Sequence, residues 1–236
     1  MAVQTVIFDW GGTLTPWHTV DHETLWHEVC GPHFSAATAG DVARVICAAE
    51  LAVWAGCERS HQSATLAQVF DQAQVTATDG LLASYFSSWE PHTFTDPEAA
   101  PVLRELRRRD IRVGVLSNTL WPRSRHERIF VRDQVIDLID GAVYSSEIPW
   151  VKPHPEAFRA AMTAVGEDDP ASCVFVGDRP YDDVHGAKGV GMRAVLIRNS
   201  DVPSYDAAVP DAIITKLPEL IRNIDHWCFH GDRMVP

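Results

Sequence analysis

Positive charge is scarce in this sequence. Its 236 residues include 20 lysines and arginines against 32 aspartates and glutamates, which gives a formal net charge of −12. Nucleic acids and anionic membranes are bound by clustered positive charge, so we expect neither among the partners. The densest basic cluster, Arg107–Arg109, follows an apolar helical pattern, and we expect it to end a helix and complement the helix dipole.

Cysteine pairs and long apolar runs are also missing. The five cysteines are widely spaced and include no C-x-x-C pair, which is typical of a protein in a reducing cytosol. No apolar run approaches the roughly 18 residues that cross a bilayer, and the first residues show no basic segment followed by an apolar stretch. We therefore predict a cytoplasmic protein without a membrane-spanning segment.

Short apolar runs rich in valine and isoleucine recur along the chain, each followed by a loop and a helical pattern. They occupy residues 5–9, 111–118, 141–146, 173–178 and 193–197. Strands that alternate with helices form right-handed βαβ units and a mostly parallel sheet covered on both faces. The predicted fold class is therefore α/β, with a Rossmann-like parallel sheet.

Residues 18–90 interrupt this alternation. They contain no convincing strand, but apolar residues in 42–53 and 66–73 follow the i, i+3, i+4, i+7 spacing of amphipathic helices. We predict a small helical cap at 18–90, inserted after the first strand, and a core formed by 1–17 and 91–236. Thr95 or Asp96 is expected to cap the next helix, with Pro97 in its first turn. Residues 225–236 are predicted to form a loose or docked tail.

Polar residues follow four of the five apolar runs. They are Asp9, the pair Ser117 and Asn118, Lys152 in the loop after the third run, and Asp178. Because ligands bind outside the carboxyl ends of parallel strands, these groups are expected to share one crevice.

The predicted crevice has the groups that phosphoryl transfer needs. A carboxylate such as Asp9 can attack phosphorus, while a lysine and a divalent metal neutralise the phosphate charge. Asp178, Asp182 and Asp183 offer oxygen ligands of the kind that Mg²⁺ prefers. The remaining phosphate oxygens are expected to bind Ser117, Asn118 and the backbone amides around Gly12 and Thr13.

Four motifs in order resemble those of the haloacid dehalogenase-like hydrolase superfamily. They read FDWGGTL at 8–14, LSNT at 116–119, VKPHPEAF at 151–158 and VGDRPYDDVHGA at 176–187. The resemblance implies a Rossmann-like core, a helical cap that selects the substrate, and a nucleophilic aspartate at Asp9. It also implies a phosphate-binding hydroxyl at Ser117, a catalytic lysine at Lys152, and a Mg²⁺ site. The implied metal ligands are Asp9, the backbone carbonyl of Gly11, Asp178 and Asp183.

The sequence departs from this family at Gly11, where phosphatases usually carry a second aspartate that acts as general acid and base. Loss of such a group typically lowers the rate by roughly 10²–10⁴-fold. One interpretation is a variant phosphatase that forms an aspartyl-phosphate and obtains proton transfer from the cap, from water or from the substrate. His18, Asp21 and His22 lie nearby in the sequence, and the sequence does not rank them.

Other interpretations remain open. Haloacid dehalogenases also lack the second aspartate, but they need no Mg²⁺, and the retained Asp178 and Asp183 favour the phosphatase. A phosphonoacetaldehyde hydrolase is set aside, because it would need a lysine in the cap and residues 18–90 contain none. A phosphate-binding relic without activity is the third alternative.

The sequence gives less information about the substrate. Four tryptophans lie beside the motifs, namely Trp10, Trp17, Trp121 and Trp150. They suit either a pocket for an apolar group, a flat group or an organic cation, or packing between core and cap. We expect the substrate to be a small phosphorylated metabolite, and the protein to be a monomer or homodimer.

Overall fold

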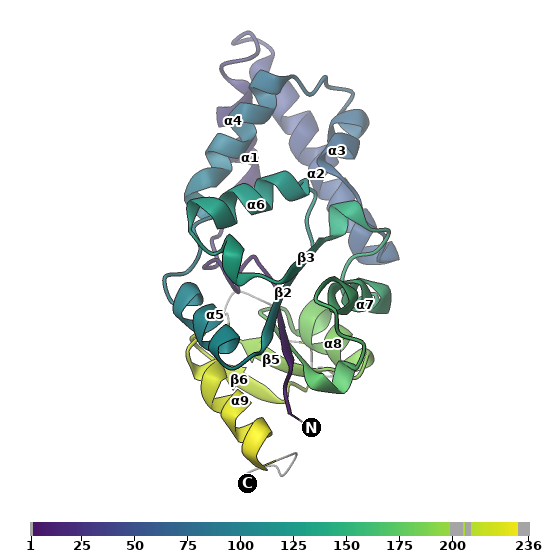
Figure 1. Ribbon diagram of the computed structural model, residues 1–236. Coiled ribbons are helices and arrows are strands. Elements are labelled where there is room, and N and C mark those ends of the chain that lie inside the picture. The colour runs from purple at the N-terminus through teal and green to yellow at the C-terminus, as the bar shows by residue number, and fades with distance from the viewer. Residues whose placement is uncertain (1, 199–204, 206–208, 231–236) are drawn as a thin grey trace.

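The computed structural model describes residues 2–198, 205 and 209–230. Its centre is a parallel sheet with the strand order β3-β2-β1-β4-β5-β6, so the predicted α/β class is confirmed (Figure 1). The strands are β1 (Thr5–Phe8), β2 (Arg112–Ser117), β3 (Gly141–Tyr144), β4 (Cys173–Gly177), β5 (Arg193–Ile197) and β6 (Ala212–Ile214). The first five strands lie in the predicted apolar runs. Strand β6 was not predicted, because an apolar run of three residues is too short to indicate a strand.

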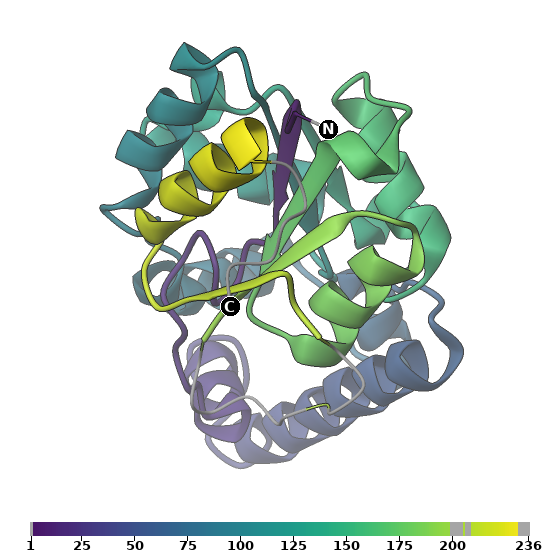
Figure 2. The same ribbon diagram turned by 90° about the horizontal axis from the view of Figure 1, so that it is seen from below.

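Helices cover both faces of the sheet, which explains why the central strands are apolar throughout (Figures 1 and 2). Helices α5 (Ala99–Arg108) and α9 (Glu219–His230) pack on one face, and α7 (Pro155–Ala164) and α8 (Gly186–Gly189) pack on the other. In the central strand β1, Phe8 pairs with Val115 on one side and Val176 on the other. This register aligns the carboxyl ends of β1, β2 and β4.

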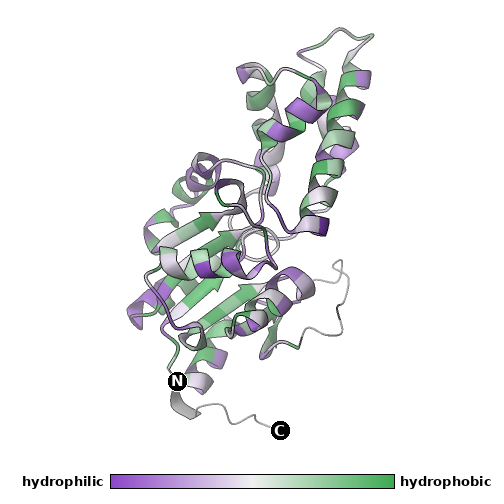
Figure 3. Cartoon of the chain, turned by 90° about the vertical axis from the view of Figure 1, so that its right-hand side faces the viewer, coloured by the Kyte–Doolittle hydropathy of each residue, from purple (hydrophilic) through white to green (hydrophobic). Residues whose placement is uncertain are grey.

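Four helices lie beyond that edge and form a second body, here called the cap helices (Figure 3). They are α1 (His22–Cys30), α2 (Ala39–Ser60), α3 (Leu66–Ala73) and α4 (Asp79–Trp89). Buried residues of all four pack together, including Trp26, Ile46, Phe70 and Tyr85. The helical patterns predicted at 42–53 and 66–73 are therefore confirmed.

The chain returns to the core through the short helical turn η1 (Glu90–His92). The prediction that Thr95 or Asp96 caps the next helix was wrong, because α5 begins at Ala99. Asp96 instead forms an earlier turn, in which its carboxylate accepts a hydrogen bond from the Glu98 amide at 2.7 Å. The Asp96 amide donates to the Leu14 carbonyl at 2.8 Å, which ties this turn to the loop after β1.

Helix α6 (Arg123–Arg132) lies between the cap helices and the sheet (Figure 1). Its Ile129 packs with the cap helices, and the adjacent Phe130 packs in the core. The remaining short helical turns are η2 (Ile136–Leu138), η3 (Ser145–Glu147), η4 (Pro170–Ser172) and η5 (Pro180–His185).

The C-terminal end of α5 lies against α9. As predicted, the basic cluster ends a helix, and Arg109 forms ion pairs with Glu105 and with Asp225 of α9. The predicted tail begins inside α9, where Trp227 is buried in the core, while its residues 231–236 lie outside the described residues. Among the described residues, no helix is long and apolar enough to cross a membrane.

Candidate active site

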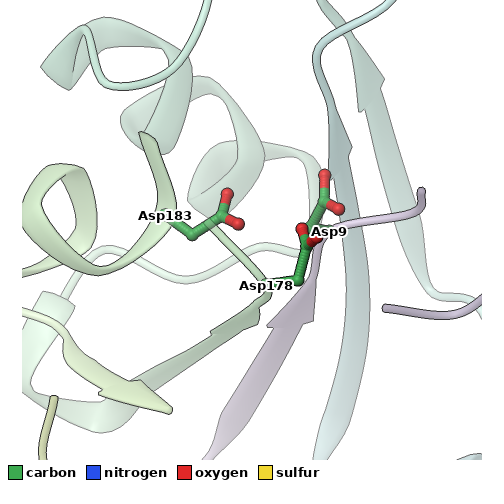
Figure 4. A group of neighbouring side chains, drawn as sticks. All are labelled: Asp9, Asp178 and Asp183. Carbon is green, nitrogen blue, oxygen red and sulfur yellow. The ribbon is translucent and has the colours of Figure 1, made fainter. Parts of the chain in front are cut away.

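Three carboxylates meet at the carboxyl edge of the sheet. Asp9 follows β1, Asp178 follows the adjacent β4, and Asp183 lies in the π-helical turn η5 (Figure 4). All three side chains are buried, and one oxygen from each lies within 4.8 Å of the others. The register of β1 and β4 brings Asp9 and Asp178 together, and the turn that follows folds Asp183 back toward them.

A buried lysine completes this cluster. The Lys152 Nζ donates to Asp9 Oδ1 at 2.5 Å and to Asp183 Oδ1 at 2.7 Å. The Asn118 side chain fixes the Lys152 backbone, because its Oδ1 accepts from the Lys152 amide at 2.8 Å and its Nδ2 donates to the Lys152 carbonyl at 3.0 Å. Asn118 thus contributes to the site by positioning Lys152.

Glycine permits the close packing of these groups. Gly12 has a φ of +82°, and a Cβ there would lie 2.5 Å from Asp178 Oδ2. A Cβ at Gly177 would lie 2.2 Å from Asp183 Oδ2. Both contacts are too short for any residue with a side chain, so the two glycines bring the backbone against the carboxylates.

Burial strongly perturbs the ionisation of the cluster. It raises the pKa of Asp178 to about 8, and the neighbouring charges of Asp9 and Asp183 add to this effect. Burial also raises the pKa of Asp9, although the Lys152 ammonium opposes the shift. For Lys152, burial alone would lower the pKa, but the carboxylates of Asp183 and Asp9 outweigh it and raise the pKa.

The cluster has the character of a site for a divalent cation. Both oxygens of Asp178 are buried without a hydrogen-bond partner, although Asp183 is held by Lys152 and by the Arg179 amide. Burial of a carboxylate without a partner costs free energy, and a bound cation that prefers oxygen ligands would offset this cost. The residues present therefore fit Mg²⁺.

A cavity of about 850 Å³ lies between the cap helices and this cluster. Its core wall contains most of the predicted site residues, which are Asp9, Gly11, Gly12, Ser117, Asn118 and Lys152. Thr13 does not line the cavity, and its backbone amide, which was predicted to bind phosphate, donates instead to the Trp10 carbonyl at 3.3 Å. Its side chain is buried, with an unpartnered hydroxyl. Asp178 and Asp183 lie buried behind the wall.

Aromatic rings form much of the cavity wall. Trp10, Trp17 and Trp121 line it, together with Trp54 and Trp89 of the cap helices. Trp150 is not among the residues that line the cavity, and its ring stacks on the His154 ring with the two centroids 3.9 Å apart. Trp10 also contacts Trp121 at a centroid distance of 5.8 Å, so the same rings pack the core against the cap helices.

The sequence interpretation missed Glu50, a carboxylate in the cap helices that is buried beside the cavity. It accepts hydrogen bonds from Trp26, Tyr85 and His22. A signal was present, because Glu50 stands four residues after Ile46, inside the apolar face of a predicted helix. Arg179, which also lines the cavity, gave no comparable signal.

Curated relatives match about half of this chain. It is 30% identical over 132 residues to a glyceraldehyde 3-phosphate phosphatase of Pyrococcus furiosus, covering 55% of this chain and 54% of the relative. It is 34% identical over 124 residues to a phosphoserine phosphatase of Thermus thermophilus, covering 52% and 49%. The chain thus spans about half the length of these curated relatives.

Solved structures share the fold over nearly the whole chain. A phosphatase from Thermococcus onnurineus superposes with a TM-score of 0.67 at 23% identity and covers 98% of this chain and 100% of its own. An L-2-haloacid dehalogenase from Xanthobacter autotrophicus superposes with a TM-score of 0.66 at 18% identity and covers 94% and 98%. At such identities the superpositions establish the fold alone.

The family itself follows from the sequence match. Residues 3–191 match the family model for haloacid dehalogenase-like hydrolases, which is well over half of the chain. The matched range contains all four motifs and the whole carboxylate cluster. The chain therefore belongs to the haloacid dehalogenase-like hydrolase family.

Proposed function

We propose that this protein is a Mg²⁺-dependent phosphatase that acts on a small phosphorylated metabolite through an aspartyl-phosphate on Asp9. The observation that carries the proposal is the unpartnered, buried carboxylate of Asp178 beside Asp9 and Lys152. A dehalogenase needs no metal, and an unpaired carboxylate there would only oppose the negative charge of Asp9. A cation bound by these oxygens turns the same arrangement into a site for a phosphate dianion.

The residues have distinct proposed roles. Asp9 attacks phosphorus, and Lys152 and the Ser117 hydroxyl bind the phosphoryl oxygens. The backbone amide of Gly12 completes the phosphate site, and Asn118 acts by holding the Lys152 backbone. The proposed metal ligands are Asp9, the Gly11 carbonyl and Asp178, with Asp183 in support. When bound, Mg²⁺ supplies positive charge that offsets the charge developing on the phosphoryl group.

In this proposal two parts of the chain with different roles face each other across the cavity. Residues 18–90 act as a substrate-selecting cap, and 1–17 with 91–236 act as the catalytic core. The chain is a variant of its family in which Gly11 stands where phosphatases usually have the acid and base aspartate. We further propose a cytoplasmic monomer or homodimer.

Relatives and cavity together suggest the size of the substrate. Two relatives are named for glyceraldehyde 3-phosphate and phosphoserine, which are both small phosphate monoesters. The cavity of about 850 Å³ accommodates a molecule of that size, and its aromatic wall favours a substrate with an apolar or flat part.

The test is phosphate release from 4-nitrophenyl phosphate and a panel of metabolite phosphates, with and without Mg²⁺. Wild type should turn over only with Mg²⁺, and Asp9→Asn should lose at least about 10³-fold in kcat. The exposed substitution Asp137→Asn serves as the control. Metal-independent halide release from 2-haloacids would instead assign a dehalogenase, and inactivity in both assays would indicate a phosphate-binding relic.

A further inference from the structure

A buried carboxylate of the cap helices holds a histidine beside the cavity. Glu50 lies in the middle of α2 and is 2% exposed. Its Oε2 accepts from Trp26 Nε1 at 2.9 Å and is 3.0 Å from His22 Nδ1, while its Oε1 accepts from the Tyr85 hydroxyl at 3.2 Å. Trp26 and Tyr85 alone already give each oxygen one donor, so His22 is an additional partner.

His22 differs in accessibility from the other two partners of Glu50. Trp26 is fully buried and Tyr85 is 1% exposed, whereas the His22 side chain is 33% exposed. His22 lines the same cavity as Asp9 and Lys152. Because Nδ1 is engaged by Glu50, Nε2 is the ring nitrogen left for a ligand in the cavity.

Other cavity histidines lack such a partner. Within the described part of the chain, His22 alone among them has an ion pair with a carboxylate. The rings of His18 and His92 contact each other at 5.3 Å, and His61 contacts the Tyr181 hydroxyl at 3.5 Å. The Glu50 hydrogen bond raises the pKa of His22 and outweighs the effect of burial.

We propose that His22, oriented by Glu50, transfers the proton that the missing acid at position 11 would otherwise supply. This inference rests on the proposed phosphatase function. In the first step Asp9 forms a bond to phosphorus, the bond to the leaving oxygen breaks, and that oxygen receives its electron pair and the Nε2 proton of His22. In the second step water attacks phosphorus, gives a proton to His22 Nε2, and the electron pair of the broken bond returns to Asp9.

The proposal predicts a dependence on the leaving group. Phenyl phosphate and 4-nitrophenyl phosphate have similar shapes, but phenolate leaves much less readily without a proton. The kcat/KM value reports the first step, which is specific to each ester, and excludes the shared hydrolysis of the aspartyl-phosphate. His22→Gln should lower kcat/KM about 100-fold for phenyl phosphate and less than about 3-fold for 4-nitrophenyl phosphate. His27→Gln, an exposed substitution on the same helix, should change neither value.

The role of Glu50 as a positioning residue requires a separate readout. Glu50→Gln removes the charge that favours protonated His22, so activity on phenyl phosphate should be lost at a lower pH than in wild type. A merely structural role would reduce activity equally at every pH. The other charged or titratable groups near His22 are Asp21 on its own segment and Tyr85 of α4. The other titratable groups that line the cavity are Asp9, His18, Cys57, Glu58, His61, His92, Lys152, Arg179, Tyr181, Asp182 and Tyr205.

The outcomes separate this inference from the proposed function. An equal loss on both esters in His22→Gln, or no loss on either, overturns the role of His22 and leaves the phosphatase in place. An unshifted pH profile in Glu50→Gln overturns the positioning role. If wild type hydrolyses neither the aryl esters nor any metabolite phosphate of the panel, or if Asp9→Asn remains active, both proposals are overturned together.

Discussion

Two adjacent glycines in the loop after β1 meet opposite steric demands. A side chain at Gly12 would collide with Asp178, whereas a Cβ at Gly11 would meet nothing within 4 Å. Packing therefore explains Gly12 but not Gly11. The absence of an acid at position 11 is a chemical property of this site, which the fold does not impose.

The open space at Gly11 leads to the first prediction. Gly11→Asp should raise kcat/KM for phenyl phosphate, by about 10-fold, since a positioned acid contributes up to several orders of magnitude. The gain should be larger in the His22→Gln background, where the proposed proton donor is missing. Gly11→Asn adds a similar volume without a proton donor and should give no gain. A gain of equal size with asparagine would show that volume, and not proton transfer, is responsible.

A second prediction concerns His126, which is buried behind the site. Its Nε2 is 3.0 Å from the Thr119 hydroxyl, and its ring stacks on Tyr144. Burial lowers the pKa of His126 from 6.5 to about 3. The unfolded chain therefore binds a proton that the folded protein rejects, and the contribution of His126 to stability falls as the pH drops below about 6.5. Between pH 7.5 and pH 5 this contribution should fall by about 2 kcal/mol. The raised pKa of Asp178 acts in the opposite direction, so the prediction concerns the difference in stability between wild type and a His126 variant.

The check is urea unfolding of wild type and His126→Phe across this pH range. The variant is expected to be less stable than wild type at pH 7.5, and this difference in stability should shrink by about 2 kcal/mol at pH 5. His27→Gln, which removes an exposed histidine, should keep the wild-type pH dependence. If wild type and His126→Phe show the same dependence of stability on pH, His126 does not contribute to it.

The sequence predicted the site best where a reactive polar residue directly follows a buried strand. Asp9, Lys152 and Asp178 are predicted because they follow buried runs, and Asp183 is predicted as a nearby oxygen ligand. The structure brings all four together. Thr13 shows the limit, because its position in the motif does not indicate that its amide is already paired with the Trp10 carbonyl. The pairing of Glu50 with His22 joins residues 28 positions apart, which no local pattern encodes.

At the scale of elements, the cap helices are tied to the loop that carries Lys152. The Ser63 amide donates to the Pro149 carbonyl at 3.0 Å, and the Val151 amide donates to the His61 carbonyl at 3.0 Å. These bonds link the loop after α2 to the residues just before Lys152. The helices on either side were predictable from apolar spacing, but this link was not, because pairing between two loops has no periodicity.

A third prediction follows from this link. Ser63→Pro removes the amide hydrogen bond to Pro149 and should destabilise the protein by about 1–3 kcal/mol. Hydrogen exchange at the Val151 and Lys152 amides should become faster, because the loop loses one of its anchors. Ser63→Ala removes only the hydroxyl contact with the Ile148 carbonyl and is the matched control. Exchange that is unchanged in Ser63→Pro would mean that the loop is held independently of the cap helices.

At the scale of the whole molecule, binding of a metal and folding should be coupled. Three buried carboxylates surround one lysine, in a chain that already carries a net charge of −12. Any ligand that binds the folded state alone raises the free energy of unfolding, by about 2.7 kcal/mol at a concentration 100 times its dissociation constant. Mg²⁺ should stabilise the wild type in this way.

The substitution Asp178→Asn distinguishes what the carboxylate cluster costs in folding free energy from its role in binding Mg²⁺. Without metal it should raise the free energy of unfolding above that of wild type, because it removes a buried carboxylate that has no hydrogen-bond partner. The same variant should gain little or no stability from Mg²⁺, because a main ligand is gone. Asp137→Asn, at an exposed position, should match wild type in both conditions. A metal-free Asp178→Asn protein that is less stable than wild type would contradict this view of the cluster. If Mg²⁺ stabilised that variant as much as it stabilises wild type, the metal would have to bind other residues.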